Sequence, residues 1–221
     1  KCVTEAIERG LPELYRYPDP YCRALVQAIA RYEGVPGEFI LCGNGASELI
    51  YAYCEAVRPG RAMELAPTFS EYSLALQRRG CGVVRFALSQ EEKFDLQERF
   101  LARLAREKID ALFLCNPNNP TGTYVPIGEL EAFADTLPED VLLVMDEAYM
   151  EFATEPDCCS MVDYMKAHPE KPILVLRTFS KYYAMAGLRV GYALGSEELI
   201  GIMRKCSASW NLNVCAQKAA E

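Results

Sequence analysis

Histidine is almost absent from this sequence, which has only one, His168, among 221 residues. Its ten cysteines are scattered, and no two of them form a Cys-x-x-Cys pair. Zinc sites are built mainly from such cysteines and histidines, so the sequence predicts no metal site. The cysteines also lack the regular spacing of a small secreted disulfide scaffold. We interpret them as reduced, mostly buried side chains of a cytoplasmic protein.

Long apolar runs and basic clusters are missing as well. No apolar run approaches the roughly 20 residues of a membrane-spanning helix. Residues 1–10 mix charges without the apolar centre of a signal peptide. Carboxylates outnumber Lys plus Arg by 31 to 23, and no more than two basic residues are adjacent. The sequence therefore predicts neither a membrane segment nor a nucleic-acid interface.

The sequence is rich in short apolar runs that alternate with amphipathic segments. Hydrophobic residues make up 51% of the chain, enough to bury a core. Several runs, such as 111–114 and 141–144, are continuously apolar, which is typical of strands covered on both faces. We predict an α/β three-layer sandwich with a mostly parallel sheet. The expected strands are 39–42, 62–65, 83–87, 111–115, 141–145, 173–177 and 189–194, and the expected helices are 21–33, 47–57, 69–79, 96–106, 127–136 and 197–206.

Sheets of this kind bind ligands beyond the C-terminal ends of their strands. The first such segment, residues 43–48, reads Gly-Asn-Gly-Ala-Ser-Glu and opens a helix. Its glycines and the helix dipole favour a phosphate there, to which Ser47 could donate. A tight turn with Ser47 as N-cap is the alternative. Glu48 replaces the third glycine of a dinucleotide fingerprint, and no P-loop lysine follows, so both nucleotide motifs fail.

Three further strand ends carry polar or reactive side chains. Two prolines in residues 116–122 make a rigid loop that directs the amide of Asn119. Asp146 ends a buried strand, where a carboxylate needs a cation or a strong donor, and Tyr149 follows three residues later. Lys181 lies among hydroxyls and aromatic rings, a setting for a nucleophilic amine. The alternatives are a polar turn, a structural salt bridge and a solvated lysine.

Together these segments suit one cofactor, pyridoxal 5′-phosphate (PLP), whose aldehyde binds a lysine and whose ring nitrogen binds a carboxylate. The chain contains Asn-Pro-x-Asn-Pro-Thr-Gly at 116–122, Asp-Glu-Ala-Tyr at 146–149 and Ser-Lys-x-x-x-x-x-Gly-Leu-Arg-x-Gly at 180–191. On these motifs it resembles the fold-type-I PLP enzymes of the class I/II aminotransferase family. The resemblance is to the branch that contains threonine-phosphate decarboxylase and histidinol-phosphate aminotransferase.

The resemblance implies a role for each matching residue. Lys181 would carry the cofactor's aldehyde, Asp146 would bind the pyridine nitrogen, and Asn119 and Tyr149 would hold the ring's 3-oxygen. Lys181, Asp146 and Tyr149 would be the catalytic residues, and Tyr72 would stack on the ring. The residues implied around the phosphate are Ala46, Ser47, Thr178 and Arg189, with Tyr17 donated by the neighbouring subunit of a homodimer.

The resemblance also implies an enzyme that acts on a small phosphorylated amino acid or amine. Residues 62–76 and 209–213 look more like the decarboxylase, an enzyme of cobalamin biosynthesis that works through an external aldimine and a quinonoid. Histidinol-phosphate aminotransferase or a related amino-acid transaminase is the alternative, and a non-catalytic PLP-binding sensor is a second one. Residues 1–20 are expected to form an N-terminal segment, part of a small domain or an arm. Residues 21–221 are expected to form the PLP-binding large domain, with the C-terminal small domain missing.

Overall fold

A single seven-stranded sheet organises the part of the chain that the computed structural model describes, residues 2–89 and 98–221. The strand order is β1-β7-β6-β5-β4-β2-β3. Only β7 runs antiparallel to its neighbours, so the expected mostly parallel sheet is confirmed. The strands are β1 Ile40–Gly43, β2 Arg61–Ala66, β3 Gly82–Ala87, β4 Ala111–Cys115, β5 Leu142–Asp146, β6 Ile173–Thr178 and β7 Gly191–Leu194.

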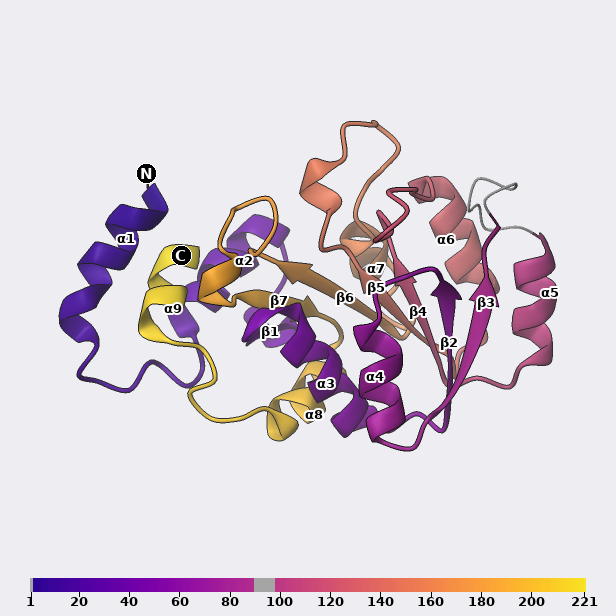
Figure 1. Ribbon diagram of the computed structural model, residues 1–221, viewed down its shortest axis with the longest axis horizontal. Helices are drawn as coiled ribbons and strands as arrows, with labels where there is room; N and C mark the ends of the chain where they lie inside the picture. The colour runs from indigo at the N-terminus through magenta and orange to yellow at the C-terminus, as the bar shows by residue number, and fades with distance from the viewer. Residues whose placement is uncertain (1, 90–97) are drawn as a thin grey trace.

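Helices cover both faces of the sheet and complete the three layers (Figure 1). Helices α3, α4 and α8 pack on one face, and α2, α5, α6 and α7 pack on the other. The central strands are buried along their whole length because both faces are covered. The helices are α1 Cys2–Gly10, α2 Arg23–Glu33, α3 Gly45–Val57, α4 Glu71–Arg78, α5 Glu98–Arg106, α6 Ile127–Thr136, α7 Val162–Ala167, α8 Glu197–Cys206 and α9 Val214–Ala220.

The seven expected strands are all present, and six expected helices have counterparts. The helix expected from residue 21 begins at Arg23, because the Asp19 carboxylate accepts bonds from the Tyr21 and Arg23 amides and holds a turn there. Residues 96 and 97 of another expected helix lie outside the described residues. Helices α1, α7 and α9 are not among the six expected helices, since short segments carry few periods of an apolar pattern.

The sheet brings the sequence motifs to one edge. Strands β1, β4, β5 and β6 all point the same way, so their C-terminal ends meet there. Strand β7 starts at that edge, and its Gly191 pairs with both Gly43 of β1 and Thr178 of β6. The loop after β1 and the loop after β6 are therefore held on either side of a single glycine.

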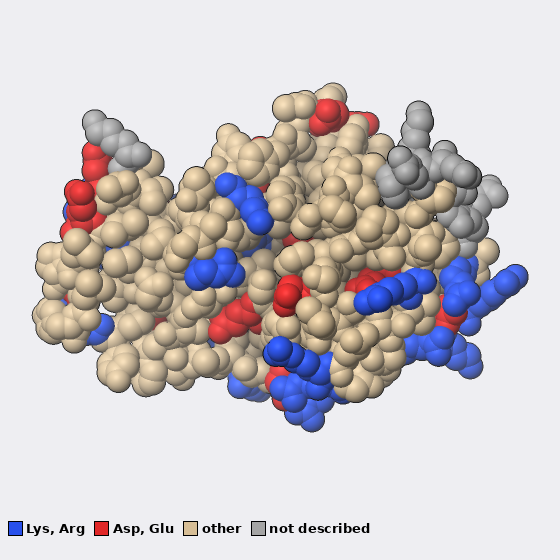
Figure 2. Space-filling model, in the orientation of Figure 1, with Lys and Arg blue, Asp and Glu red and all other residues tan. Residues whose placement is uncertain are grey.

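Three general features of the described residues are their surface charges, their cysteines and the length of their helices. Figure 2 shows many Lys and Arg side chains along the lower edge of this face. Several arginines of the chain pair with carboxylates: Arg58 and Arg79 bind Glu55, and Arg61 binds Glu107. All ten cysteines are free thiols, and six of them are buried. Within residues 2–89 and 98–221, no helix has the length and apolar character needed to cross a membrane.

Candidate active site

A cavity of about 250 Å³ opens at the C-terminal edge of the sheet. It gathers eight of the ten residues expected at a cofactor site: Ala46, Ser47, Asn119, Asp146, Tyr149, Thr178, Lys181 and Arg189. The other two expected residues, Tyr17 and Tyr72, do not line it. Five lining residues were not predicted: Phe69, Cys115, Ala148, Ser180 and Ala186. The motifs at four strand ends therefore form one site.

One end of the cavity is a tight turn against an arginine. Gly45 has φ +78°, a conformation that glycine adopts without strain, and a Cβ atom there would lie 2.5 Å from Nη2 of Arg189. A Cβ atom on Gly191 would lie 2.7 Å from the Ala46 amide nitrogen. Both glycines let the guanidinium and the strand approach the turn closely. Arg189 pairs with no carboxylate in the described part of the chain, so its charge is available to an anion.

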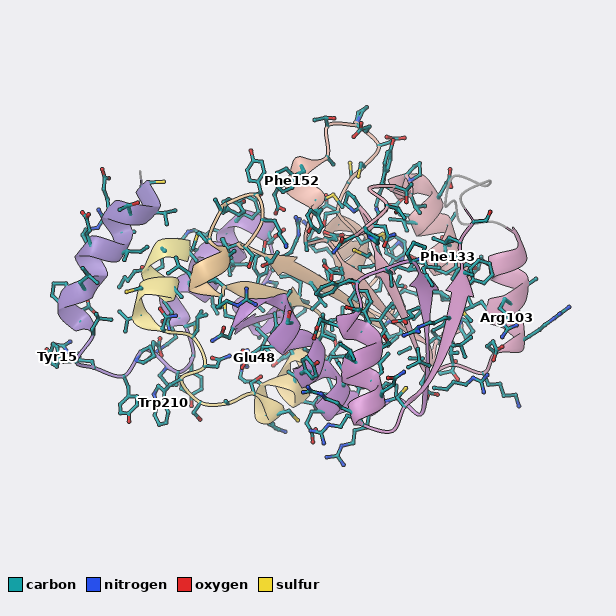
Figure 3. The ribbon with its side chains drawn as sticks, in the orientation of Figure 1. Tyr15, Glu48, Arg103, Phe133, Phe152 and Trp210 are labelled. Atoms are coloured by element: carbon teal, nitrogen blue, oxygen red, sulfur yellow. The ribbon has the colours of Figure 1, made fainter. Side chains whose placement is uncertain are left out.

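The same end contains the start of α3. No side chain caps the first amides of this helix, and Ser47 lies in its first turn. The Glu48 carboxylate instead accepts bonds from the Asn44 amide, 2.6 Å, and from Asn211 Nδ2, 2.7 Å, which fixes the turn from outside (Figure 3). Free amides, the helix dipole, a hydroxyl and a guanidinium together suit an anion such as phosphate, and we call this part of the cavity its phosphate end.

Asp146 forms the buried wall at the other end. Its Oδ2 accepts a hydrogen bond from the Tyr72 hydroxyl at 2.6 Å, and its Oδ1 accepts one from the Ala148 amide at 3.0 Å. Burial raises the pKa of Asp146 above its ordinary value, although the Tyr72 bond and the charge of Lys181 act in the opposite direction. A buried carboxylate of this kind favours a cationic partner inside the cavity.

The structure corrects the expectation for Tyr72. This residue was expected to stack on the cofactor ring, but it is fully buried beneath the cavity, where it packs on Phe113 and bonds to Asp146. The ring that lines the cavity belongs to Phe69, which meets Tyr72 edge-to-face with 5.6 Å between centroids. Both aromatics are in the segment that the sequence singled out. Tyr72 belongs to α4 and turns inward, whereas Phe69 precedes that helix.

The loop after β4 contains three asparagines, of which Asn118 and Asn119 differ in their contacts. Asn118 is buried, and its Nδ2 donates to Pro67 O at 3.0 Å and to Thr121 Oγ1 at 2.8 Å, so it holds the loop together. Asn119 is left to line the cavity. Beside it, burial raises the pKa of the Cys115 thiol to about 12, so this cysteine stays neutral.

Lys181 extends from the loop after β6. Its Nζ lies 5.4 Å from the centre of the Tyr149 ring, and it has no ion-pair partner among the described residues. The neighbouring Tyr182 meets Phe152 edge-to-face with 5.4 Å between ring centroids, so this loop contacts the 3₁₀ turn at residues 150–152. Ser180 was missed by the sequence analysis although it precedes the lysine. Its hydroxyl lies 3.5 Å from Arg189 Nη1, which adds it to the phosphate end.

Tyr17 lies away from this cavity. It is 80% exposed and contacts Trp210 with 4.9 Å between ring centroids. Trp210 projects from the loop between α8 and α9 (Figure 3), and its neighbour Asn211 bonds to Asn44 and Glu48 beside the phosphate end. The exposed Tyr17–Trp210 pair is thus tied to the outside of the site and takes no part in its lining.

The whole chain, residues 1–221, matches the family described as aminotransferase class I and II. The chain belongs to this family. It is 37% identical to threonine-phosphate decarboxylase of Salmonella typhimurium and 38% identical to histidinol-phosphate aminotransferase of Geobacillus thermodenitrificans, with 99% of this chain covered in both. The chain spans only 59% of the length of each of these relatives.

A solved structure of the family gives the same fold. The histidinol-phosphate aminotransferase of Sinorhizobium meliloti, in complex with pyridoxal-5′-phosphate, superposes with a TM-score of 0.91 at 28% identity. The match covers 99% of this chain and 59% of that one. In the present aminotransferase-family chain, the donor set of the cavity fits PLP: an uncapped helix start and Arg189 suit the phosphate, buried Asp146 suits the pyridine nitrogen, and Lys181 suits the aldehyde.

Proposed function

We propose that this chain is the cofactor-binding part of a PLP-dependent enzyme that acts on a small phosphorylated amino acid or amine. The observation that carries the proposal is the placement of Asp146 and Lys181 on the walls of one cavity whose far end holds Ser47 and Arg189. These groups lie at three strand ends and match three parts of PLP. The buried acid matches the ring nitrogen, the amine of Lys181 matches the aldehyde, and Ser47 with Arg189 matches the phosphate.

The residues that line the cavity would have different roles in the reaction. The cofactor, when bound, would withdraw electrons from the α-carbon of a substrate amine held on its aldehyde. Asp146 would keep a proton on the ring nitrogen, and Lys181 would move a proton at the α-carbon. Asn119 and Tyr149 would orient the ring through its 3-oxygen, and Phe69 would cover one ring face and exclude water.

The more specific proposal is a threonine-phosphate decarboxylase of cobalamin biosynthesis. It is supported by residues 62–76 and 209–213, which look more like that enzyme. Histidinol-phosphate aminotransferase is the second candidate, because the two relatives match at 37% and 38% identity. The two reactions differ in which bond at the α-carbon breaks, and a substrate is oriented for that choice by contacts to its carboxylate and phosphate. A PLP-binding sensor without catalysis is the candidate from another class.

The proposal includes a cytoplasmic homodimer. Tyr17 is 80% exposed and braced by Trp210, as suits an aromatic side chain that reaches a neighbouring subunit's phosphate site. The ten free thiols suit a reducing compartment. Residues 1–20 would form the arm and residues 21–221 most of the large domain.

The cofactor is tested by absorbance of the full-length protein. We expect a visible band with PLP that borohydride abolishes, leaving the cofactor covalently attached to Lys181 in a peptide digest. Lys181→Ala should lose both signals. Lys166→Ala, which removes an exposed lysine paired with Asp163, should keep them. Absence of PLP binding, or an unchanged band in Lys181→Ala, would refute the proposal.

The reaction is tested by two parallel assays on the same holoprotein. One offers O-phosphothreonine and measures CO2, and the other offers histidinol phosphate with 2-oxoglutarate and measures glutamate. CO2 without glutamate would eliminate the aminotransferase, and glutamate without CO2 would eliminate the decarboxylase. A protein that binds PLP and turns over neither substrate would favour the sensor.

A further inference from the structure

A buried arginine lies on the face of the sheet opposite the cavity. Arg177 of β6 is 6% exposed and faces three carboxylates. Its Nη1 lies 2.9 Å from Glu151, its Nε 3.2 Å from Glu147 and its Nη2 3.9 Å from Glu33. The Tyr192 hydroxyl of β7 donates to Glu33 at 2.5 Å. We call these five residues the Arg177 cluster.

The Arg177 cluster contacts the ends of β5 and β6 on the face of the sheet opposite the cavity. Side chains alternate across a strand, so Arg177 and Thr178 point to opposite faces of β6. Glu147 directly follows Asp146 of β5, and Glu151 comes two residues after Tyr149. No member of the cluster lines the cavity. Its ion pairs nevertheless join the ends of β5 and β6, from which Asp146 and Lys181 extend.

The cluster has more acid than base. With all three carboxylates ionised and one guanidinium, the buried group would carry a net charge of −2, which is costly in a low-dielectric interior. Arg177 Nε lies near Glu147 but makes no hydrogen bond to it. Such a site favours the retention of a proton on one of its acids.

Glu147 is the acid most suited to hold that proton. Its side chain is 0% exposed, against 7% for Glu33 and 13% for Glu151. The bonds that its oxygens accept from the Ser160 hydroxyl and the Met161 amide, both at 2.7 Å, act in the opposite direction and favour the carboxylate. Burial raises the pKa of Glu147 to about 7, against the attraction of Arg177. Burial also raises the pKa of Glu151.

The other titratable groups around Glu147 and Glu151 include two further members of the cluster and one neighbouring tyrosine. Glu33 belongs to α2 and Tyr192 to β7, and Tyr183 of the loop after Lys181 faces Glu151 and Arg177. Burial raises the pKa of Tyr183 to about 12, so it stays neutral. Arg177 is thus the only cation paired with these carboxylates in the part of the chain that the structure describes, while Lys166 Nζ donates to the main-chain carbonyl of Glu33 at 3.3 Å.

We propose that Arg177 is a positioning residue for the cavity and that its cluster keeps one proton, carried by Glu147, below neutral pH. The positioning part rests on the proposed PLP function, whereas the proton does not. The cluster fixes the relative placement of the segments that carry Asp146 and Lys181, and loss of its proton introduces a second uncompensated charge behind them.

The proton is tested by urea unfolding of the full-length protein between pH 5 and 8. The folded pKa of Glu147 lies above its unfolded value of 4.5, so its stabilising effect is lost as pH rises toward 7. The folding equilibrium constant of wild type should therefore fall more steeply than that of Glu147→Gln, by up to about tenfold per pH unit between pH 5 and 7, and the two slopes should converge above pH 7. Glu139→Gln, at an exposed position, should keep the wild-type slope. Equal slopes for wild type and Glu147→Gln would overturn the proton assignment.

The positioning role is tested by PLP affinity, measured only where each variant is folded by circular dichroism. Arg177→Lys keeps the charge but loses the planar fork that reaches three acids. We expect its PLP Kd to rise about tenfold, whereas a merely structural role would lower stability and leave the Kd of folded protein unchanged. If Arg177→Lys does not fold, Tyr192→Phe, which frees only Glu33, should raise the Kd about threefold. An unchanged Kd in the folded variant would overturn the positioning role.

The two proposals fail separately. If wild type binds no PLP, the proposed function is wrong, and the unfolding slopes still decide whether Glu147 holds a proton. If wild type binds PLP and Arg177→Lys binds it equally well, the function stands and the positioning role falls.

Discussion

The hydroxyl of Tyr72 lies 2.6 Å from Oδ2 of Asp146, beneath the cavity. Because burial raises the pKa of Asp146, this bond is one of the few interactions that favour its ionised form. Tyr72 would thus act on the ring nitrogen of a bound cofactor indirectly, through the charge of Asp146. Of the two aromatic residues Phe69 and Tyr72, only Phe69 lines the cavity and could contact the ring of the cofactor.

Tyr72→Phe should weaken PLP binding. The substitution removes a hydrogen bond to a charged group, worth about 1.5–3 kcal/mol, and leaves Asp146 more readily protonated. We expect the PLP Kd to rise at least tenfold, measured by titration of the apoprotein. Tyr164→Phe removes a similar bond, to Asp135 at 2.7 Å, on the other face of the sheet and should leave the Kd unchanged. Equal affinities of the two variants would contradict the role of Tyr72.

Phe69→Leu should reduce PLP affinity without unfolding the protein. Phe69 is only partly buried and lines the cavity, so the change removes an aromatic contact worth about 0.5–1.5 kcal/mol. A rise of roughly three- to tenfold in the PLP Kd follows. Phe133→Leu, in the core far from the cavity (Figure 3), should lower the unfolding midpoint and spare the Kd. Wild-type affinity in Phe69→Leu would show that another residue covers the ring.

The sequence was sufficient for the strands and for most of the site because their signals are local. Continuous apolar runs predict buried strands, and the groups that follow them meet wherever parallel strands end. Phe69 and Tyr72 were not told apart, because the two rings lie three residues apart and only the packing of α4 decides which one faces the cavity. The Arg177 cluster could not be predicted from the sequence, because most of its residues are far apart along the chain. Its acids come from α2, the end of β5 and a 3₁₀ turn, and only the folded sheet joins them.

Gly45→Ala should damage the phosphate end of the cavity. The new Cβ atom would lie 2.5 Å from Arg189 Nη2, and the residue would keep a positive φ that alanine adopts at a cost of about 1 kcal/mol. We expect a rise of more than tenfold in the Kd of PLP. Gly80→Ala is the matched control, since Gly80 has φ +75° but no atom within 4 Å of its Cβ position. Gly80→Ala should lose a similar amount of stability from backbone strain alone and should bind PLP with wild-type affinity. Equal PLP affinity in the two variants would contradict the importance of the close approach of Arg189.

Asp146 should make the stability of the protein without PLP fall as pH rises, and the stabilisation by PLP should grow over the same pH range. Its folded pKa is raised above the ordinary 3.8, so without PLP its contribution is present below 3.8 and is lost as pH rises through the raised value. A cation on the cofactor ring would favour the carboxylate, so the stabilisation by saturating PLP should grow over the same window. Unfolding midpoints from pH 4 to 8, with and without PLP, measure both effects. Asp146→Asn should lose both, while Asp140→Asn, at an exposed position, should keep them. A PLP-dependent gain that is independent of pH in wild type would mean that Asp146 is not the partner of the ring nitrogen.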